Sequence, residues 1–223
     1  MRICVLIPIH NEIREIGRLV AAIRKMNLEV VVVDDGSTDG SGEAARREGA
    51  AVLVNPEKQG KGRSLQKGFA HALQESFDGV ITMDGDGQHD PEDLEAFLNE
   101  IVRHPQGIIT GSRMAHPKGM PLVRLWTNFF MSFWISLVCG QKVPDTQCGF
   151  RYVSADVLKN ITLTANDFEI ETEVLIKASR RRYPIFSMPI KTIYRDEESK
   201  IHPFKDTARF FIYMIKEMRT TSR

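Results

Sequence analysis

The chain has 223 residues, of which 42% are apolar and 26% charged, and its 30 basic and 29 acidic residues give a net charge of +1. This length and composition suit one globular domain with a substantial core, over residues 1–223. The near-neutral charge excludes the overall positive field that draws a protein onto nucleic acid. The three cysteines are odd in number and far apart, which argues against a disulfide framework or a zinc site and indicates reduced thiols in a cytoplasm.

The apolar segments predict no membrane crossing. Residues 3–7 are apolar over too short a stretch for a signal peptide, and they indicate a buried first strand instead. The longest apolar candidate, residues 121–140, is interrupted by Arg124 and by several Thr, Asn and Ser residues. We therefore expect that it does not span a bilayer.

Short β-branched segments alternate with helical patterns in the first half of the chain, which predicts an α/β fold with a mostly parallel central sheet. The predicted strands are residues 3–7, 30–33, 51–54, 79–83 and 108–110. Apolar residues at helical spacing predict helices around 16–23, 65–73 and 94–101, and Pro91 is placed to open the third. From residue 121 the pattern becomes aromatic-rich and mixed, so we expect the sheet to end and accessory elements to begin there.

Polar motifs follow the predicted strands, at the edge where open α/β sheets bind ligands. They are His10-Asn11-Glu12, residues 34–39, and Asp84-Gly85-Asp86-Gly87-Gln88-His89. The Asp35-Gly36-Ser37 turn taken alone is equally compatible with a turn followed by a helix cap.

The Asp84-x-Asp86 pair is more specific, because two carboxylates one residue apart repel each other unless a cation lies between them. Mg²⁺ or Mn²⁺ takes oxygen ligands and often combines one or two carboxylates with phosphate oxygens, which predicts Asp84, Asp86 and the Gln88 amide as ligands. Gly85 leaves room for a ligand to approach the backbone. The alternative is an acidic loop before the helix that Pro91 opens.

Six motifs occur in the order of a known enzyme family. They are Pro8-x-x-Asn11-Glu12, residues 33–40, Asn55-x₄-Gly60-Lys61-Gly62, Asp84-Gly-Asp86-Gly-Gln88-His89, Gly111-Ser112-Arg113 and residues 145–151. On these residues the chain resembles the family 2 glycosyltransferases of the GT-A nucleotide-diphospho-sugar transferase fold. Within that family it resembles the polyprenol-phosphate, or dolichol-phosphate, sugar transferases, although glycines replace the Ala and Leu usual between their acidic residues and glutamine.

The resemblance implies an inverting, metal-dependent hexosyltransferase that uses a UDP- or GDP-sugar with Mg²⁺ or Mn²⁺. Its nucleotide-sugar-binding half is expected over residues 1–115 and its acceptor half over 116–200. The donor residues implied are Pro8, Asn11, Glu12, Asp35, Asp84, Gly85 and Asp86, of which Pro8, Glu12 and Asp35 would line the nucleoside pocket. Lys61, between two glycines, is placed to reach a phosphate, although a solvated loop lysine is equally compatible with the pattern.

The departing nucleotide builds up negative charge, which a dication and fixed arginines can stabilise. Arg113 and Arg124 match family arginines that contact phosphate groups, and a surface arginine is the alternative at each position. An acceptor hydroxyl needs a general base, whereas an acceptor phosphate is already an anionic nucleophile. Asp145 is the predicted base where one is required; otherwise it caps a turn beside Pro144.

Residues 121–139 form a predicted amphipathic helix that carries both tryptophans of the chain on a wide aromatic face. Such a face suits a helix lying at a membrane interface, and it also suits packing on the sheet or in a homodimer. The resemblance favours the membrane, because the related transferases have an interface helix here. The acceptor residues that we expect are Arg124, Asn128, Arg151, Glu169, Ser199 and Lys200. A basic amphipathic helix is predicted over residues 203–223.

Together these features predict transfer of a sugar to a lipid-linked acceptor, a polyprenol phosphate, by an enzyme bound peripherally at the cytoplasmic face of the membrane. Two alternatives remain at this point. One keeps the donor site and uses a soluble or carrier-bound hydroxyl acceptor. The other is a catalytically silent protein that binds a nucleotide or recruits a membrane partner, against which the intact Asp84, Asp86 and Gln88 argue.

Overall fold

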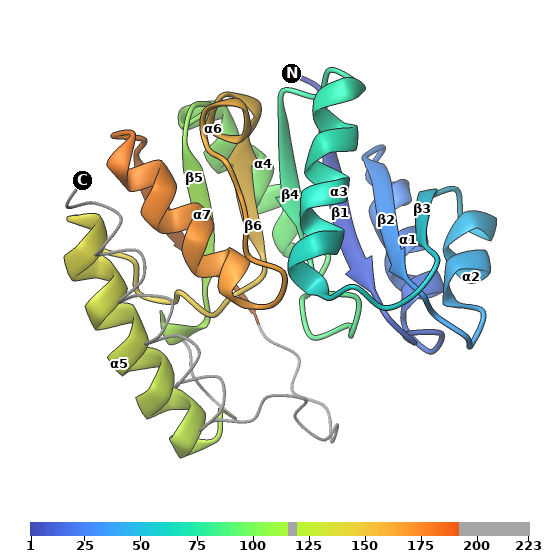
Figure 1. Cartoon of the computed structure of the whole chain (residues 1–223), viewed down its shortest axis with the longest axis horizontal. Coiled ribbons are helices and arrows are strands. Elements are labelled where there is room, and N and C mark those ends of the chain that lie inside the picture. Colours follow the sequence, from blue (N-terminus) through green and yellow to red (C-terminus); the bar gives the residue numbers. More distant parts are fainter. Residues whose placement is uncertain (116–119, 192–223) are drawn as a thin grey trace.

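A seven-stranded sheet in the order β3-β2-β1-β4-β6-β5-β7 forms the centre of the molecule (Figure 1). The computed structural model describes residues 1–115 and 120–191. The strands are β1 (Ile3–Ile9), β2 (Glu29–Asp35), β3 (Ala51–Asn55), β4 (Gly79–Thr82), β5 (Ile108–Ser112), β6 (Arg151–Ser154) and β7 (Ile185–Pro189). Strand β6 runs antiparallel to both neighbours, and every other pairing is parallel.

Both faces of this sheet are covered by helices. One face packs against α3 (Lys61–Gln74), α6 (Ala155–Asn160) and α7 (Glu169–Arg180), with α5 (Leu122–Cys139) beside α7. The other face packs against α1 (Ile16–Lys25), α2 (Ser41–Arg47) and α4 (Asp93–Arg103). A short 3₁₀ helix, η1 (Arg113–Ala115), follows β5. The predicted α/β fold with a mostly parallel sheet and helices on both faces is therefore confirmed.

The central strands are apolar almost throughout because they are buried on two sides. In β1, Cys4 and Leu6 pack in one helix layer, whereas Val5 and Ile7 pack in the other. This burial explains why short apolar segments of the sequence predicted the strands.

The prediction that the sheet ends near residue 121 is wrong. All five predicted strands are present, but β6 and β7 extend the sheet from the second half of the chain. Strand β6 lies between β4 and β5, so its partners are far from it in sequence. Pairing of this kind depends on tertiary packing, which a local pattern does not report.

The predicted aromatic helix is present as α5, and of the helices that the structure describes it is the one long and apolar enough to cross a membrane. Its polar residues therefore do not exclude a span by length and composition alone, and the expectation that it does not cross a bilayer stays a prediction. Its inner residues, including Met131 and Ile135, are buried in the core shared with α7. The predicted helix over residues 203–223 lies outside the described residues.

A buried carboxylate, Glu173, holds the loop before α7 in place. Its oxygens accept hydrogen bonds from the Thr164 and Ala165 backbone amides at 2.9–3.0 Å, and Lys177 Nζ lies 2.6 Å away. Burial raises the pKa of Glu173, but the Lys177 ammonium and these amides outweigh burial and lower the pKa below its ordinary value. The charged form of Glu173 therefore stabilises the folded loop.

Replacing Glu173 with Gln removes that charge and is expected to lower the free energy of unfolding by about 2 kcal/mol at pH 7, because buried donors lose a charged acceptor. The lowered folded pKa means that this stabilisation is complete above the unfolded pKa of about 4.3 and is lost as the pH falls through the folded pKa. Urea unfolding at pH 7 and pH 3 should show the difference between wild type and variant shrinking in acid. Glu48→Gln, at an exposed position, is the control and should change little.

Candidate active site

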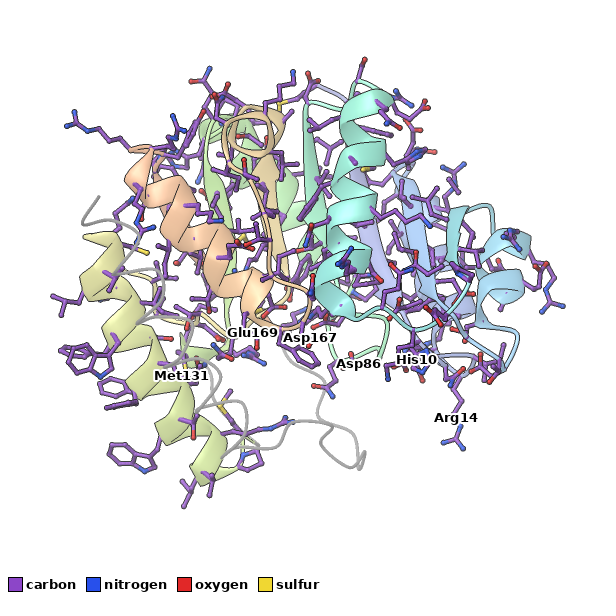
Figure 2. All side chains as sticks on the ribbon, viewed as in Figure 1. His10, Arg14, Asp86, Met131, Asp167 and Glu169 are labelled. Atoms are coloured by element: carbon purple, nitrogen blue, oxygen red, sulfur yellow. The ribbon has the colours of Figure 1, made fainter. Side chains whose placement is uncertain are left out.

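The carboxyl ends of β1, β2 and β4 meet at one edge of the sheet, and the predicted polar motifs gather there. In Figure 2, Glu169, Asp167, Asp86 and His10 follow one another along this edge of the molecule. The parallel pairing of β1 with β2 and β4 explains this convergence, because it directs the three strand ends the same way.

The motifs after β1 and β2 are joined by hydrogen bonds between backbone amides and side-chain oxygens. Asn11 has a positive φ of 58°, and its Oδ1 accepts from the Thr38 amide at 2.9 Å. Its own amide donates to Ser37 Oγ, and the Glu12 amide donates to Ser41 Oγ at 2.8 Å. Asn11 therefore holds the two loops together, beside the positions predicted to line a nucleoside pocket.

Asp35 accepts hydrogen bonds from the segment that leads into α3 and holds it in place. Its Oδ1 accepts from Asn55 Nδ2 and the Gln59 amide, and its Oδ2 accepts from the Gly60 amide, at 2.8–2.9 Å. Burial raises the pKa of Asp35, but these donors outweigh burial and lower it. Because Asp35 is buried and all three of these bonds are internal, the predicted direct contact with a nucleoside is not what the structure favours.

Lys61 lies between two carboxylates rather than in solvent. Its Nζ lies 2.5 Å from Asp84 Oδ1 and 2.6 Å from Glu171 Oε1, and its side chain is 16% exposed. The reading of Lys61 as a solvated loop lysine is thus wrong. Burial lowers the pKa of Lys61, but Asp84 and Glu171 outweigh burial and raise it, so the amine is charged.

Asp84 and Asp86 have opposite electrostatic environments. Burial raises the pKa of Asp84, yet attraction to Lys61 outweighs it and lowers the pKa to about 2. Burial and the negative charge of Asp84 both raise the pKa of Asp86. The backbone N–H of Gln88 donates to Asp86 Oδ1 at 3.0 Å. Of these two carboxylates, Asp86 is therefore the one whose charged form a bound cation would stabilise more.

These residues fit a divalent cation that shares its ligands with a phosphate group. In the described part of the chain, no three His, Cys, Asp or Glu side chains converge as a cation site. Two carboxylates and an amide leave coordination positions to be filled, which is the usual arrangement for Mg²⁺ bound with substrate phosphates. Asp84, Asp86 and the Gln88 side chain are the residues that would hold it.

Asp145 is enclosed by Arg113 and α5. Arg113 Nε and Nη2 donate to its two carboxylate oxygens at 2.8 and 2.9 Å, and Asn128 Nδ2 donates to Oδ1 at 2.8 Å. Burial raises the pKa of Asp145, but Arg113 and Asn128 outweigh burial and lower it. A fully buried carboxylate held in this way is poorly placed to accept a proton from an acceptor, so the arrangement does not favour the base role of Asp145, which stays a prediction.

Two predicted acceptor residues also make hydrogen bonds inside the protein. Asn128 is buried and joins α5 to Asp145. Arg151 is buried in β6, and its guanidinium donates to the carbonyls of Cys148, Thr146 and Glu171 at 2.5–2.7 Å. These internal bonds do not favour the acceptor role of Asn128 and Arg151, which stays a prediction.

The other predicted acceptor residues and Pro8 have different surroundings. Arg124, on the first turn of α5, and Glu169, at the start of α7, are half-buried. Pro8 lines a small pocket together with Lys61 and Asp84. Ser199 and Lys200 lie outside the described residues.

Sequence reasoning missed Glu171 and Gly149. Glu171 belongs to the acidic start of α7, and its role becomes visible only once α7 packs beside α3. A Cβ on Gly149 would lie 2.6 Å from Asp84 Oδ2, so this glycine leaves room for the Asp84 carboxylate. The Gly149-Phe150-Arg151 motif was the available signal, although nothing in it indicates contact with β4.

A family model described as "Glycosyl transferase family 2" matches residues 4–162. The chain belongs to glycosyl transferase family 2. It is a glycosyltransferase, and it is similar to the undecaprenyl-phosphate mannosyltransferase of Micrococcus luteus, with 31% identity over 90% of this chain and 88% of that protein. It is also similar to the UDP-N-acetylglucosamine–dolichyl-phosphate N-acetylglucosaminyltransferase of Methanococcus voltae, with 29% identity over 87% and 86% of the two chains.

The fold is shared with solved glycosyltransferases. The crystal structure of mannosyl-3-phosphoglycerate synthase from Rubrobacter xylanophilus has a TM-score of 0.75 to this chain, at 17% identity, and the likeness covers 100% of this chain and 75% of that one. Together with the family match, this likeness confirms the expected GT-A fold.

Gly149→Ala should weaken Mn²⁺-dependent binding of a nucleoside diphosphate by about tenfold or more, because the new Cβ displaces Asp84, and misplacing one charged contact costs about that much. Calorimetry with UDP and GDP measures the effect, and a thermal melt checks the fold. Gly17→Ala is the matched control, because a Cβ there approaches no atom closer than 3.9 Å. Unchanged affinity in Gly149→Ala would show that the position of Asp84 does not matter.

Proposed function

We propose that this glycosyltransferase moves a sugar, with inversion, from a nucleoside-diphosphate sugar to a polyprenol-phosphate acceptor at the cytoplasmic face of a membrane. The convergence of Asp84, Asp86 and Lys61 at the carboxyl end of β4 is the observation that carries the donor half. The acceptor half is supported by two similar proteins, whose names give undecaprenyl phosphate and dolichyl phosphate as their acceptors.

The donor site is built to accept a diphosphate. A divalent cation held by Asp84, Asp86 and Gln88 would neutralise the leaving nucleotide as its negative charge develops. Arg113 is fixed by both oxygens of Asp145 and contributes to the lowered pKa of Asp84, so its positive charge acts on the same place. Because the Arg113 guanidinium is already oriented by Asp145, it can stabilise the leaving group without further rearrangement.

The state of Asp145 favours an acceptor that brings its own charge. A hydroxyl acceptor needs a base, and Asp145 is buried and bound to Arg113. A phosphate acceptor attacks with an anionic oxygen, so no proton has to be removed. The new bond joins that oxygen to the anomeric carbon, and the bond from this carbon to the nucleotide diphosphate breaks.

The outer face of α5 is the proposed contact with the membrane. Trp126 is 70% exposed, Phe129 59% and Phe133 57%, while the inner face of the helix packs with α7. Tryptophan and phenylalanine on one exposed helix face are typical of an interfacial helix. A second copy of the chain or a membrane partner protein is the alternative occupant of this face.

The proposed activity is tested by incubating the enzyme and Mn²⁺ with UDP- or GDP-sugars and an acceptor panel, and following radiolabel into lipid. We expect transfer to polyprenyl phosphate in vesicles and no transfer to unphosphorylated polyprenol. Asp86→Asn should lower turnover at least about 100-fold with little change in melting temperature, because it removes a charge that binds cation and leaving group. Efficient transfer to a soluble hydroxyl acceptor would overturn the proposed acceptor.

Replacing Trp126 and Phe133 with Ser tests the membrane contact. Both side chains are mostly exposed, so the fold should be kept, while binding to vesicles in a flotation assay should fall about tenfold or more, because an aromatic side chain contributes about 1.5–3 kcal/mol on burial. Val102→Ser, at an exposed apolar position on α4, is the control. If vesicle binding is unchanged and a dimer dissociates instead, α5 is an interface between copies.

A further inference from the structure

Lys61 occupies a position that a bound cation would contest. Its ammonium lies 2.5 Å from Asp84 Oδ1, the oxygen of the first predicted metal ligand. A dication bound to Asp84 would repel an ammonium so close to it. Either the cation stays away from Asp84, or Lys61 gives up this contact when the cation arrives.

Hydrogen bonds hold the backbone at Gly60, next to Lys61, and at Glu171, one of the two partners of its ammonium. On one side, Gly60 adopts a φ of 101° and donates its amide to the buried Asp35, which fixes the backbone where α3 begins. On the other side, Arg151 donates to the Glu171 carbonyl. Lysine has a flexible four-carbon stem with three rotatable donors, so Nζ can change partner while its backbone stays in place.

Glu171 gives Lys61 a second partner that is not a predicted cation ligand. Its Oε1 lies 2.6 Å from Nζ, and its side chain is 11% exposed. If Lys61 left Asp84, Glu171 would keep the ammonium at the site instead of releasing it to solvent. The Phe168 ring, 5.7 Å from Nζ, adds a further favourable contact on this side.

We propose that Lys61 is an exchangeable counter-charge for Asp84, and that Glu171 is the positioning residue that retains it. Before the donor binds, Lys61 neutralises Asp84. When a cation and a nucleoside diphosphate bind together, the cation would replace Lys61 at Asp84. The Lys61 ammonium would keep its contact with Glu171 and move to contact the diphosphate. This inference rests on the proposed donor site.

The exchange has a consequence that an ordinary phosphate-binding lysine lacks. A cation without diphosphate must displace Lys61 from Asp84 and receives no phosphate ligands in return, so it binds weakly. A cation with diphosphate supplies a new partner for Lys61. Lys61 therefore opposes binding of the metal alone and favours binding of the metal with the nucleotide.

Lys61→Met tests this opposition. We expect affinity for Mn²⁺ alone, followed by the electron paramagnetic resonance of free Mn²⁺, to rise about tenfold, because Asp84 loses its competitor. Affinity for UDP or GDP at saturating Mn²⁺, measured by calorimetry, should fall about tenfold, because the diphosphate loses one charged hydrogen bond. Lys61→Gln should behave in the same way and covers the case in which Lys61→Met does not fold.

Two further variants separate the proposal from simpler explanations. Glu171→Gln leaves Lys61 on Asp84 alone, so affinity for Mn²⁺ alone should not rise while diphosphate affinity falls. Lys58→Met makes the same charge change at an exposed position in the same loop and should alter both affinities by less than about twofold.

A Lys61→Met enzyme whose affinity for Mn²⁺ alone is unchanged or lower would overturn the proposal, because Lys61 would then be a phosphate ligand only or a structural ion pair. An equal rise in Lys58→Met would also overturn it, because the effect would come from net charge. If the wild-type enzyme bound neither UDP nor GDP with Mn²⁺, the proposed donor site itself would fail.

Discussion

Asp84 lies where three parts of the chain meet, and its negative charge is the constraint on which the rest of the site depends. Lys61 reaches it from α3, Gly149 leaves room for it in the segment before β6, and Asp86 follows it at the end of β4. Burial of this carboxylate would be costly without a positive partner. Lys61 supplies that partner, and the neighbouring carboxylate of Asp86, whose pKa is raised by burial and by Asp84, leaves the site able to attract a cation.

Several polar residues that were expected to touch ligands make internal hydrogen bonds in the structure. Asp35 holds the backbone from which Lys61 projects, and Arg151 holds the carbonyl of Glu171. Asn128 and Arg113 share Asp145. Each of these side chains is buried or largely buried, and a buried polar group must satisfy its hydrogen bonds inside the protein. Such groups resemble ligand-binding residues in sequence because both kinds are polar residues beside strand ends.

The helix α5 connects the interior of the site with the outer surface. Its inner side carries Asn128 and Ser132, which bond to Asp145 and Thr146. Its outer side exposes aromatic residues such as Trp126 and Phe129. A helix with a bonded polar row on one side and an apolar face on the other is held in a single orientation, so whatever covers the outer face lies at a constant position relative to Arg113 and Asp145.

The sequence by itself determined the strands β1 to β5, the helices α1, α3, α4 and α5, the family, and the carboxylates Asp84 and Asp86, because burial periodicity and short motifs are local properties of a chain. Tertiary structure decided the placement of β6 and β7, the partnership of Lys61 with Glu171, and the inward roles of Asp35, Asn128, Arg151 and Asp145. These depend on contacts between segments distant in sequence, such as the 110 residues that separate Lys61 from Glu171. A motif specifies which polar groups are present, but packing decides which of them remain exposed to a ligand.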